Sequence, residues 1–114
     1  MTKFAGQKNN LVLCIMKISS GQLYYTYVTT NPGKTVLYIG MTNDLKRRLS
    51  EHYENRGKKD HFASKFYCYK LLYYEIYETA IEAIQREKAI KNLTREKKLA
   101  LIRLKNAALN FIII

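Results

Sequence analysis

The strongest constraint on the fold is a pair of strand-like segments that flank Pro32 and Gly33. Residues 24–30 are rich in Tyr, Thr and Val, which favour β-strands, and residues 36–40 resume the same pattern. Pro followed by Gly suits the two central positions of a type II turn. The sequence therefore predicts an antiparallel hairpin at this place in the chain.

A symmetric hairpin centred on Pro32 and Gly33 would place Tyr27 directly opposite Tyr38. Directly opposed residues share one face of a sheet, whereas a slip of one residue would separate them. We therefore expect the two phenols to meet on one side of the hairpin.

The rest of the chain alternates between helix and strand patterns. Asn43 and Asp44 supply a helix cap and a first-turn acid, Thr79 and Glu82 form a capping box, and Thr94 caps a further helix. The expected elements are a helix at 43–53, an exposed loop at 54–64, a central strand buried on both faces at 67–77, helices at 79–92 and 94–104, and an ending at 109–114 that covers the core or forms a last strand.

This β-β-α-β-α-α order predicts an α+β fold, a small three-stranded antiparallel or mixed sheet flanked by helices. Residues 1–20 are weakly patterned and we interpret them as an N-terminal extension, followed by a single domain over residues 21–114.

Charge and cysteine usage narrow the function classes. Lys and Arg number 20 against 9 acidic residues, and the net charge of +11 predicts a polyanionic partner, either nucleic acid or an anionic membrane surface. Cys14 and Cys68 are too few for a disulfide scaffold and form no zinc motif, so we expect free thiols that pack in the protein. The apolar runs are too short to span a bilayer, and we expect a cytoplasmic protein.

A carboxylate interrupts the apolar side of the helix expected at 79–92. On a helical wheel Glu87 falls in the arc formed by Ile81, Ala83, Ile84 and Ile90. An ionised carboxylate facing a core is costly unless it is paired, hydrogen-bonded or metal-bound. A buried ion pair, a helix that rolls Glu87 to the rim, and a functional role all stay open at this point.

The helix expected at 43–53 repeats the feature. Arg48 and His52 lie one turn apart on the face that Leu45 and Leu49 turn inward, whereas Lys46, Arg47 and Glu51 point outward. A single His that points inward is usually a hydrogen-bonded core residue. Arg48 cannot lose its charge, and its presence beside His52 weakens that interpretation.

Together these positions suit phosphodiester cleavage. Arg48 would neutralise charge on the phosphate, and Glu87 would hold Mg²⁺ with help from phosphate oxygens. Tyr27, Tyr38 and His52 would position water or pass a proton.

The same residues lie in a pattern that resembles the GIY-YIG nuclease superfamily. The chain reads YTY at residues 25–27 and YIG at residues 38–40, followed by a helix with an arginine and, four residues on, a histidine, and later by QREK at residues 85–88. It looks most like the small single-domain bacterial branch, which is related to the nuclease domain of the excision-repair machinery. Tyr25 and Thr26 stand where the family has Gly and Ile, and the ending around Asn106 follows the branch only in part, so a site role for Asn106 stays open.

The resemblance implies a metal-dependent DNA endonuclease on a small sheet core, with one Mg²⁺ or Mn²⁺ per site. By position, Tyr27 and Tyr38 are the motif tyrosines, Arg48 stabilises the phosphate, His52 assists proton transfer and Glu87 binds the metal. The remaining motif residues are Tyr25, Ile39 and Gly40, the last of which allows a close approach to its backbone. Six basic residues are the candidate DNA contacts: Lys46, Arg47, Lys58, Lys59, Lys88 and Lys91.

We expect low sequence specificity, action in DNA repair or recombination, no membrane partner, and a monomer or weak homodimer. The alternatives are a catalytically weak nucleic-acid-binding module with the same fold, and a fragment that needs a larger repair complex for targeting. Residues 46–70 and 81–105 each carry eight basic and three acidic groups, so the excess charge flanks the candidate site.

Overall fold

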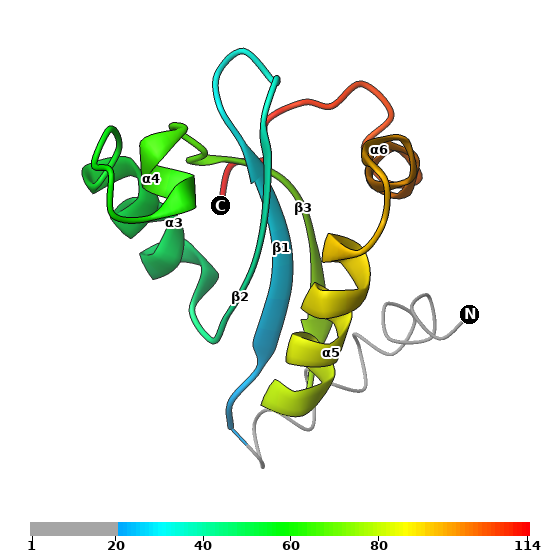
Figure 1. The fold of residues 1–114 in the computed structure, drawn as a ribbon. Helices are drawn as coiled ribbons and strands as arrows, with labels where there is room; N and C mark the ends of the chain where they lie inside the picture. Colours follow the sequence, from blue (N-terminus) through cyan, green and yellow to red (C-terminus); the bar gives the residue numbers. More distant parts are fainter. Residues whose placement is uncertain (1–20) are drawn as a thin grey trace.

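A three-stranded antiparallel sheet organises the chain in the computed structural model, which describes residues 21–114. The strands β1 (Tyr24–Thr30), β2 (Leu37–Thr42) and β3 (Lys70–Tyr77) pair in the order β2-β1-β3. Figure 1 shows α3 and α4 on one side of the sheet and α5 and α6 on the other. The helices are α3 (Leu45–Glu54), α4 (Phe62–Lys65), α5 (Ala80–Lys91) and α6 (Arg95–Arg103). The α+β class and the predicted element order are confirmed, with α4 as an addition. The extension expected at 1–20 and Cys14 lie outside the described residues.

The central strand is β1, and the prediction that the apolar segment at 67–77 is central is wrong. β3 pairs with β1 along one edge, and on its other edge only an isolated bridge joins Leu71 to Ile112 among the described residues. An apolar run reports that both faces of a strand are covered, and it says nothing about how many hydrogen-bonded neighbours the strand has. Here the helix layers on both sides of the sheet explain the run.

The hairpin register differs from the symmetric one by two residues. Tyr27 lies opposite Gly40, and Tyr38 lies opposite Thr29. Because side chains alternate with a period of two, this shift keeps both tyrosines on one face, as predicted. The consequence is that a residue without a side chain faces Tyr27.

The connection at residues 31–36 explains the longer register. The backbone N–H of Lys34 donates to the carbonyl of Asn31 at 2.9 Å, and the Asn31 side chain accepts from the N–H groups of Thr35 and Val36. Lys34, not Gly33, has the positive φ, of 59°. The expected type II turn is therefore wrong, because that turn needs a positive φ at Gly33.

Local cap signals set the helix starts. The side chain of Asp44 accepts from the N–H of Arg47, that of Thr79 from Glu82, and that of Thr94 from Lys97, each at the first turn of its helix. These caps confirm the predicted helix starts, but Asp44 is itself the cap of α3, and the acid expected in the first turn of that helix is absent. The short helix α4, in contrast, ends the segment that we expected to be a loop.

The two faces of the sheet have separate cores. Val28, Ile39, Leu72, Ile90 and Ile102 pack together on the α5 and α6 side. The α3 side instead holds a second cluster: Tyr27, Leu45 and Leu71, with Tyr25, Tyr38, Leu49, Tyr74 and Ile112 packed against it. The second core is therefore rich in tyrosine, and this is the side on which the candidate residues of α3 lie.

The apolar arc predicted for α5 is only half correct. Ala83 and Ile90 are fully buried, but Ile81 is 67% exposed and Ile84 is 38% exposed. The helix is rolled so that Arg86 turns inward and reaches Glu75 on β3. An ion pair with a buried carboxylate has thus decided the orientation that the hydrophobic pattern left open.

The C-terminal segment closes one edge of the fold. The Asn106 amide donates to the carbonyls of Leu72 and Asn110 at 2.9 and 2.8 Å, which gives Asn106 a structural contact between this segment and β3. The ending thus both covers the core and forms a one-residue bridge, through Ile112. Every helix in the described part of the chain is too short or too polar to cross a bilayer.

Candidate active site

The centre of the candidate site is a buried pair formed by Tyr27 and His52. Tyr27 is 1% exposed, and its hydroxyl lies 2.9 Å from Nε2 of His52. The phenol can lie there because Gly40 faces it: a Cβ atom on that glycine would come within 2.5 Å of the hydroxyl oxygen. The close approach expected at Gly40 is therefore real, and the group that approaches is the tyrosine ring.

Burial sets the protonation of this pair. Burial, followed by the charge of Arg48, lowers the pKa of His52 from its ordinary 6.5 to about 4. Burial also raises the pKa of Tyr27 well above its ordinary value of 10, and nearby Tyr38 adds to that rise. At neutral pH the pair is therefore an uncharged imidazole and an uncharged phenol. The phenol donates to Nε2 in the tautomer that carries its proton on Nδ1.

Tyr38 connects this pair to a cavity. Its ring centroid lies 6.2 Å from that of Tyr27, 5.4 Å from that of His52 and 6.3 Å from that of Phe62. The cavity has a volume of about 360 Å³, and its lining includes Tyr38, Arg48, His52, Asn55 and Phe62. The site thus opens on the side where α3 and α4 meet.

Arg48 is the charged group of the cavity. Its side chain is 36% exposed, and it donates to Glu51 at 2.9 Å. The other carboxylate oxygen of Glu51 accepts from Arg47 at 2.8 Å. Two guanidinium groups thus share one carboxylate, and Arg48 retains N–H donors that can bind an anion. We expected Glu51 to point outward, and helical periodicity gave no sign of this pairing.

Glu87 lies on α5, outside the lining of the cavity that contains Arg48. The Glu87 side chain is 19% exposed, and its carboxylate lies 3.0 Å from Nζ of Lys91. The structure therefore places Glu87 at the rim of the surface that α5 packs against the sheet. The charge of Glu87 adds to the raised pKa of Tyr27, behind the larger effects of burial and of Tyr38, whereas Arg48 acts in the opposite direction. The carboxylate therefore lies near enough to act on the buried phenol.

The donor set suits a weakly held, hard cation. The described residues contain no group of three or more His, Cys, Asp or Glu side chains placed to hold a metal. Mg²⁺ is commonly bound by one or two carboxylates together with substrate phosphates and waters. Glu87 fits that mode, whereas neutral His52 is already engaged with Tyr27.

The other motif residues build the sheet. Ile39 is 4% exposed and belongs to the core under α5 and α6. Tyr25 packs edge-to-face against Tyr74, with their ring centroids 6.2 Å apart. Both residues support the strands that carry Tyr27 and Tyr38.

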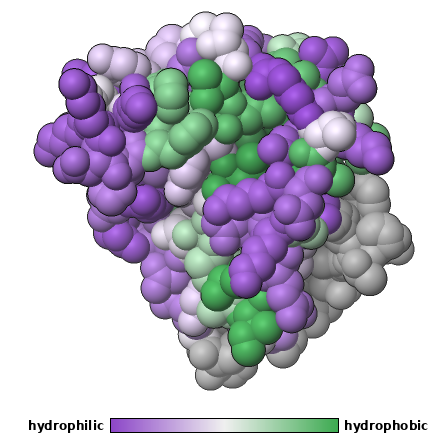
Figure 2. Space-filling model, viewed as in Figure 1, coloured by the Kyte–Doolittle hydropathy of each residue, from purple (hydrophilic) through white to green (hydrophobic). Residues whose placement is uncertain are grey.

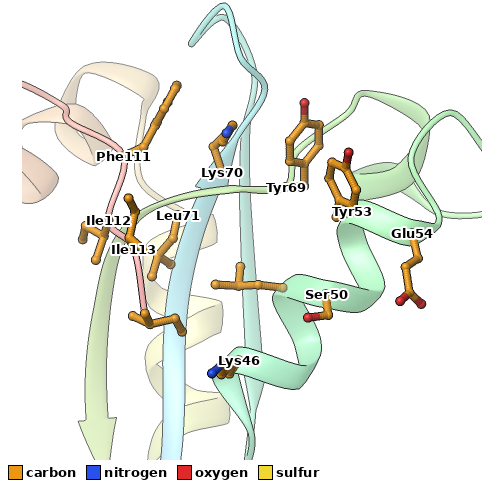
Figure 3. A pocket seen from close by; sticks show the side chains of 12 residues that line it. Lys46, Ser50, Tyr53, Glu54, Tyr69, Lys70, Leu71, Phe111, Ile112 and Ile113 are labelled. Atoms are coloured by element: carbon orange, nitrogen blue, oxygen red, sulfur yellow. The ribbon is translucent and has the colours of Figure 1, made fainter.

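The six candidate DNA contacts are all exposed, but they do not form one cluster: Lys46, Arg47, Lys58, Lys59, Lys88 and Lys91. Lys46 turns away from the site and lines a separate cavity of about 510 Å³ between α3, the start of β3 and the C-terminal segment (Figure 3). Tyr27, Arg48, His52 and Glu87 do not line that cavity. The size of this cavity therefore does not identify it as the candidate active site.

A buried polar cluster on the opposite face escaped the sequence reasoning. Glu75 is fully buried and accepts from Arg86 at 2.9 Å, from the hydroxyl of Tyr77 at 2.6 Å and from the hydroxyl of Tyr73. The ion pair and the two hydroxyls hold the pKa of Glu75 below its ordinary value despite burial, which acts in the other direction. The one available signal was an acid inside an apolar strand pattern, but its partner is eleven residues away.

The chain is similar to known proteins over the same region. The family model for the GIY-YIG catalytic domain matches residues 23–100. UPF0213 proteins of Staphylococcus aureus strains Mu50 and N315 are each 42% identical over 67 residues, which is 59% of this chain and 79% of theirs. The solution NMR structure of a UPF0213 protein from Bacillus halodurans is 27% identical, with a TM-score of 0.49, over 75% of this chain and 88% of that one. Because the family model covers most of the chain and spans Tyr27 to Glu87, the protein belongs to the GIY-YIG family, a nuclease superfamily.

Proposed function

We propose that this protein is a metal-dependent DNA endonuclease of low sequence specificity that hydrolyses phosphodiester bonds. The observation that carries the proposal is the buried, uncharged Tyr27–His52 pair beside the partly exposed guanidinium of Arg48. A proton acceptor next to a phosphate-binding cation is the combination that phosphodiester hydrolysis needs.

Each side chain has a role that follows from its surroundings. Arg48 binds a non-bridging phosphate oxygen and stabilises the charge that builds on it during attack. Neutral His52 accepts a proton passed through the hydroxyl of Tyr27, since these two groups are already hydrogen-bonded. Tyr38, which is only half-buried, orients the attacking water at the mouth of the cavity.

Glu87 is the residue that would hold Mg²⁺ or Mn²⁺, with phosphate oxygens and water as the other ligands. The bound ion would stabilise negative charge on the leaving oxygen. Before the metal binds, the Glu87 carboxylate must separate from Lys91. This ion pair is weak because the Lys91 side chain is half-exposed.

Low sequence specificity follows from the kind of contact available. The exposed Lys and Arg side chains contact phosphates, and phosphate contacts position a protein without reading bases. Binding should therefore weaken steeply as salt rises, since each neutralised phosphate releases counterions. Binding that is insensitive to ionic strength would contradict a phosphate-dominated interface.

The direct test is nicking of supercoiled plasmid in the presence of Mg²⁺, Mn²⁺ or excess EDTA. We expect nicking with either ion and none with EDTA. Glu87→Gln should abolish nicking but keep DNA binding. The matched control is Glu82→Gln on the same helix, where Gln preserves the capping box with Thr79.

One observation favours a catalytically weak nucleic-acid-binding module as the second candidate. Arg48 pairs with Glu51, and Glu87 pairs with Lys91. Both charged groups therefore already have a partner within the protein. This candidate prevails if pure protein binds DNA with strong salt dependence but nicks none with either ion, and if Glu87→Gln changes nothing. Roles in repair or recombination, a monomer or weak homodimer, targeting by a larger repair complex and a cytoplasmic location stay predictions.

A further inference from the structure

Exposed aromatic side chains gather beside the cavity, on and around α4. Phe62, Phe66 and Tyr67 are 52%, 38% and 49% exposed. Figure 2 shows apolar side chains reaching the surface in the middle of this view, between the hydrophilic regions near α3 and α4 and those near α5. Exposed aromatic groups in such a cluster indicate a binding surface, because burial elsewhere would be more favourable.

Phe62 is the exposed aromatic residue that lines the cavity beside Arg48. Tyr67 lies outside the lining of that cavity, and Lys65 lies over the ring of Phe66 at 5.4 Å. Phe62, in contrast, has no cation over its ring among the described residues. Its ring contacts are with Tyr38 and Phe66, at 6.3 and 4.8 Å between centroids.

The surroundings of Phe62 are those of a nucleic-acid surface. Phe62 lines the same cavity as Arg48, and its ring lies within 22° of parallel to that of Tyr38. Residues 53–70, the segment that contains α4, carry five Lys or Arg against two acidic residues. An aromatic face beside phosphate-binding cations is the pattern that holds unpaired nucleotides.

We propose that Phe62 stacks on an unpaired nucleobase next to the phosphate that Arg48 binds. The inference rests on the proposed function, and it narrows the substrate class to DNA with an unpaired nucleotide beside the cleaved bond. A base inside a duplex is stacked on its neighbours and cannot offer its face to Phe62 without being turned out of the helix. Single strands, flaps and looped-out nucleotides offer that face directly.

The first test measures binding without metal, so that no cleavage interferes. Fluorescence anisotropy in EDTA compares wild type, Phe62→Ala and Phe62→Leu on a labelled single strand, its duplex and the same strand with abasic positions. Phe62→Ala should weaken single-strand binding about 5- to 100-fold and leave duplex and abasic binding unchanged. Phe62→Leu should behave like Phe62→Ala, because it keeps apolar volume but has no aromatic face. Equal losses on all three ligands would overturn the stacking role.

A second test detects the contact between residue 62 and the nucleobase by fluorescence. The chain contains no Trp, so a Trp introduced at position 62 gives the whole Trp signal. Phe62→Trp should retain single-strand affinity, and its fluorescence should be quenched by the single strand and not by the abasic strand. Leu104→Trp is the matched control, since Leu104 is 66% exposed at the end of α6, away from the cavity lining. Quenching at both positions, or at neither, would contradict the proposal.

The two proposals fail in different ways. If wild type nicks plasmid with Mg²⁺ but Phe62→Ala binds single strands as well as wild type does, only the stacking inference is wrong. If Phe62 variants lose single-strand binding selectively but no protein nicks DNA with either ion, stacking stands and the nuclease proposal is wrong.

Discussion

Two buried polar clusters containing tyrosine lie on opposite faces of the same small sheet. On the α5 side, the carboxylate of Glu75 accepts from Arg86 and from the hydroxyls of Tyr73 and Tyr77, and every member is held by the others. On the α3 side, Tyr27 is hydrogen-bonded to His52 and lies close to Arg48, which lines the neighbouring cavity.

The difference lies in charge balance and access. In the Glu75 cluster one buried carboxylate meets one guanidinium and two hydroxyl donors, which is a closed arrangement that stabilises the fold. In the Tyr27 cluster burial leaves both partners uncharged, and the nearest charge, on Arg48, faces a cavity that a ligand can enter. We infer that the first cluster positions α5 and the second performs the chemistry.

The largest expected effect is on stability, at Glu75. Glu75→Gln should lower the free energy of unfolding by about 3–5 kcal/mol, because it leaves the charge of Arg86 without its buried partner. Glu87→Gln, in a pair with the half-exposed Lys91, should change stability by less than about 1 kcal/mol and yet remove cleavage. Urea denaturation of both variants is the measurement, and equal losses of stability would break the distinction between the clusters.

The next largest effect is on cleavage, at Arg48. Arg48→Ala should lower the nicking rate about 100- to 1000-fold by removing the group that stabilises charge on the phosphate. Arg47→Ala is the comparison: Arg47 shares Glu51 but faces solvent, so its loss should weaken DNA binding and leave the nicking rate at saturating protein close to that of wild type. Single-turnover nicking on plasmid distinguishes them, and a wild-type rate for Arg48→Ala would show that another cation binds the phosphate.

A pH titration follows, because His52 is buried uncharged. The pKa of His52 is about 4 in the folded protein and near 6.5 in the unfolded chain. The unfolded chain therefore binds the proton first, so stability is fully present above pH 6.5 and is lost as the pH falls towards 4, by roughly 3 kcal/mol in total. His52→Gln should make the urea midpoint less dependent on pH between 6.5 and 4 than it is in wild type, and an unchanged dependence would contradict the burial of a neutral imidazole.

The smallest effect is at the glycine that faces Tyr27. Gly40→Ala places a Cβ atom against the Tyr27 ring and should cost about 1–3 kcal/mol, with weaker cleavage because the hydrogen bond to His52 is displaced. Gly33→Ala is the control, since the nearest side-chain atoms to its Cβ lie at 3.9 Å. Thermal unfolding compares the two, and equal melting temperatures would mean that the Tyr27 ring moves freely.

The parts of the fold that were predicted correctly depend on local signals. β1 covers the predicted residues 24–30, and Thr79 and Thr94 begin the predicted helices, because strand propensity and side-chain caps act over a few residues. Apart from the turn at residues 31–36 and the hairpin register that it sets, the errors concern longer range. The edge position of β3, the burial of Glu75 and the roll of α5 all depend on which distant segment packs against which.

The candidate site follows the same division. Helical periodicity placed Arg48 and His52 on one face, and strand periodicity placed Tyr27 and Tyr38 on one face, and both are confirmed. The hydrogen bond between Tyr27 and His52 joins residues 25 positions apart and was not predictable from either pattern. Likewise Phe62 enters the cavity only because α4, a helix too short to show a periodicity, folds back against α3.

The sequence by itself determined the order of the elements, the helix caps, the basic charge and the motif residues of the GIY-YIG family, because each of these depends on residue types and short spacings. Only the tertiary structure decided which of those residues meet and in which protonation state. It brought Tyr27, Gly40 and His52 together in a buried site, and burial made the imidazole a neutral proton acceptor, since removal from water disfavours the charged form.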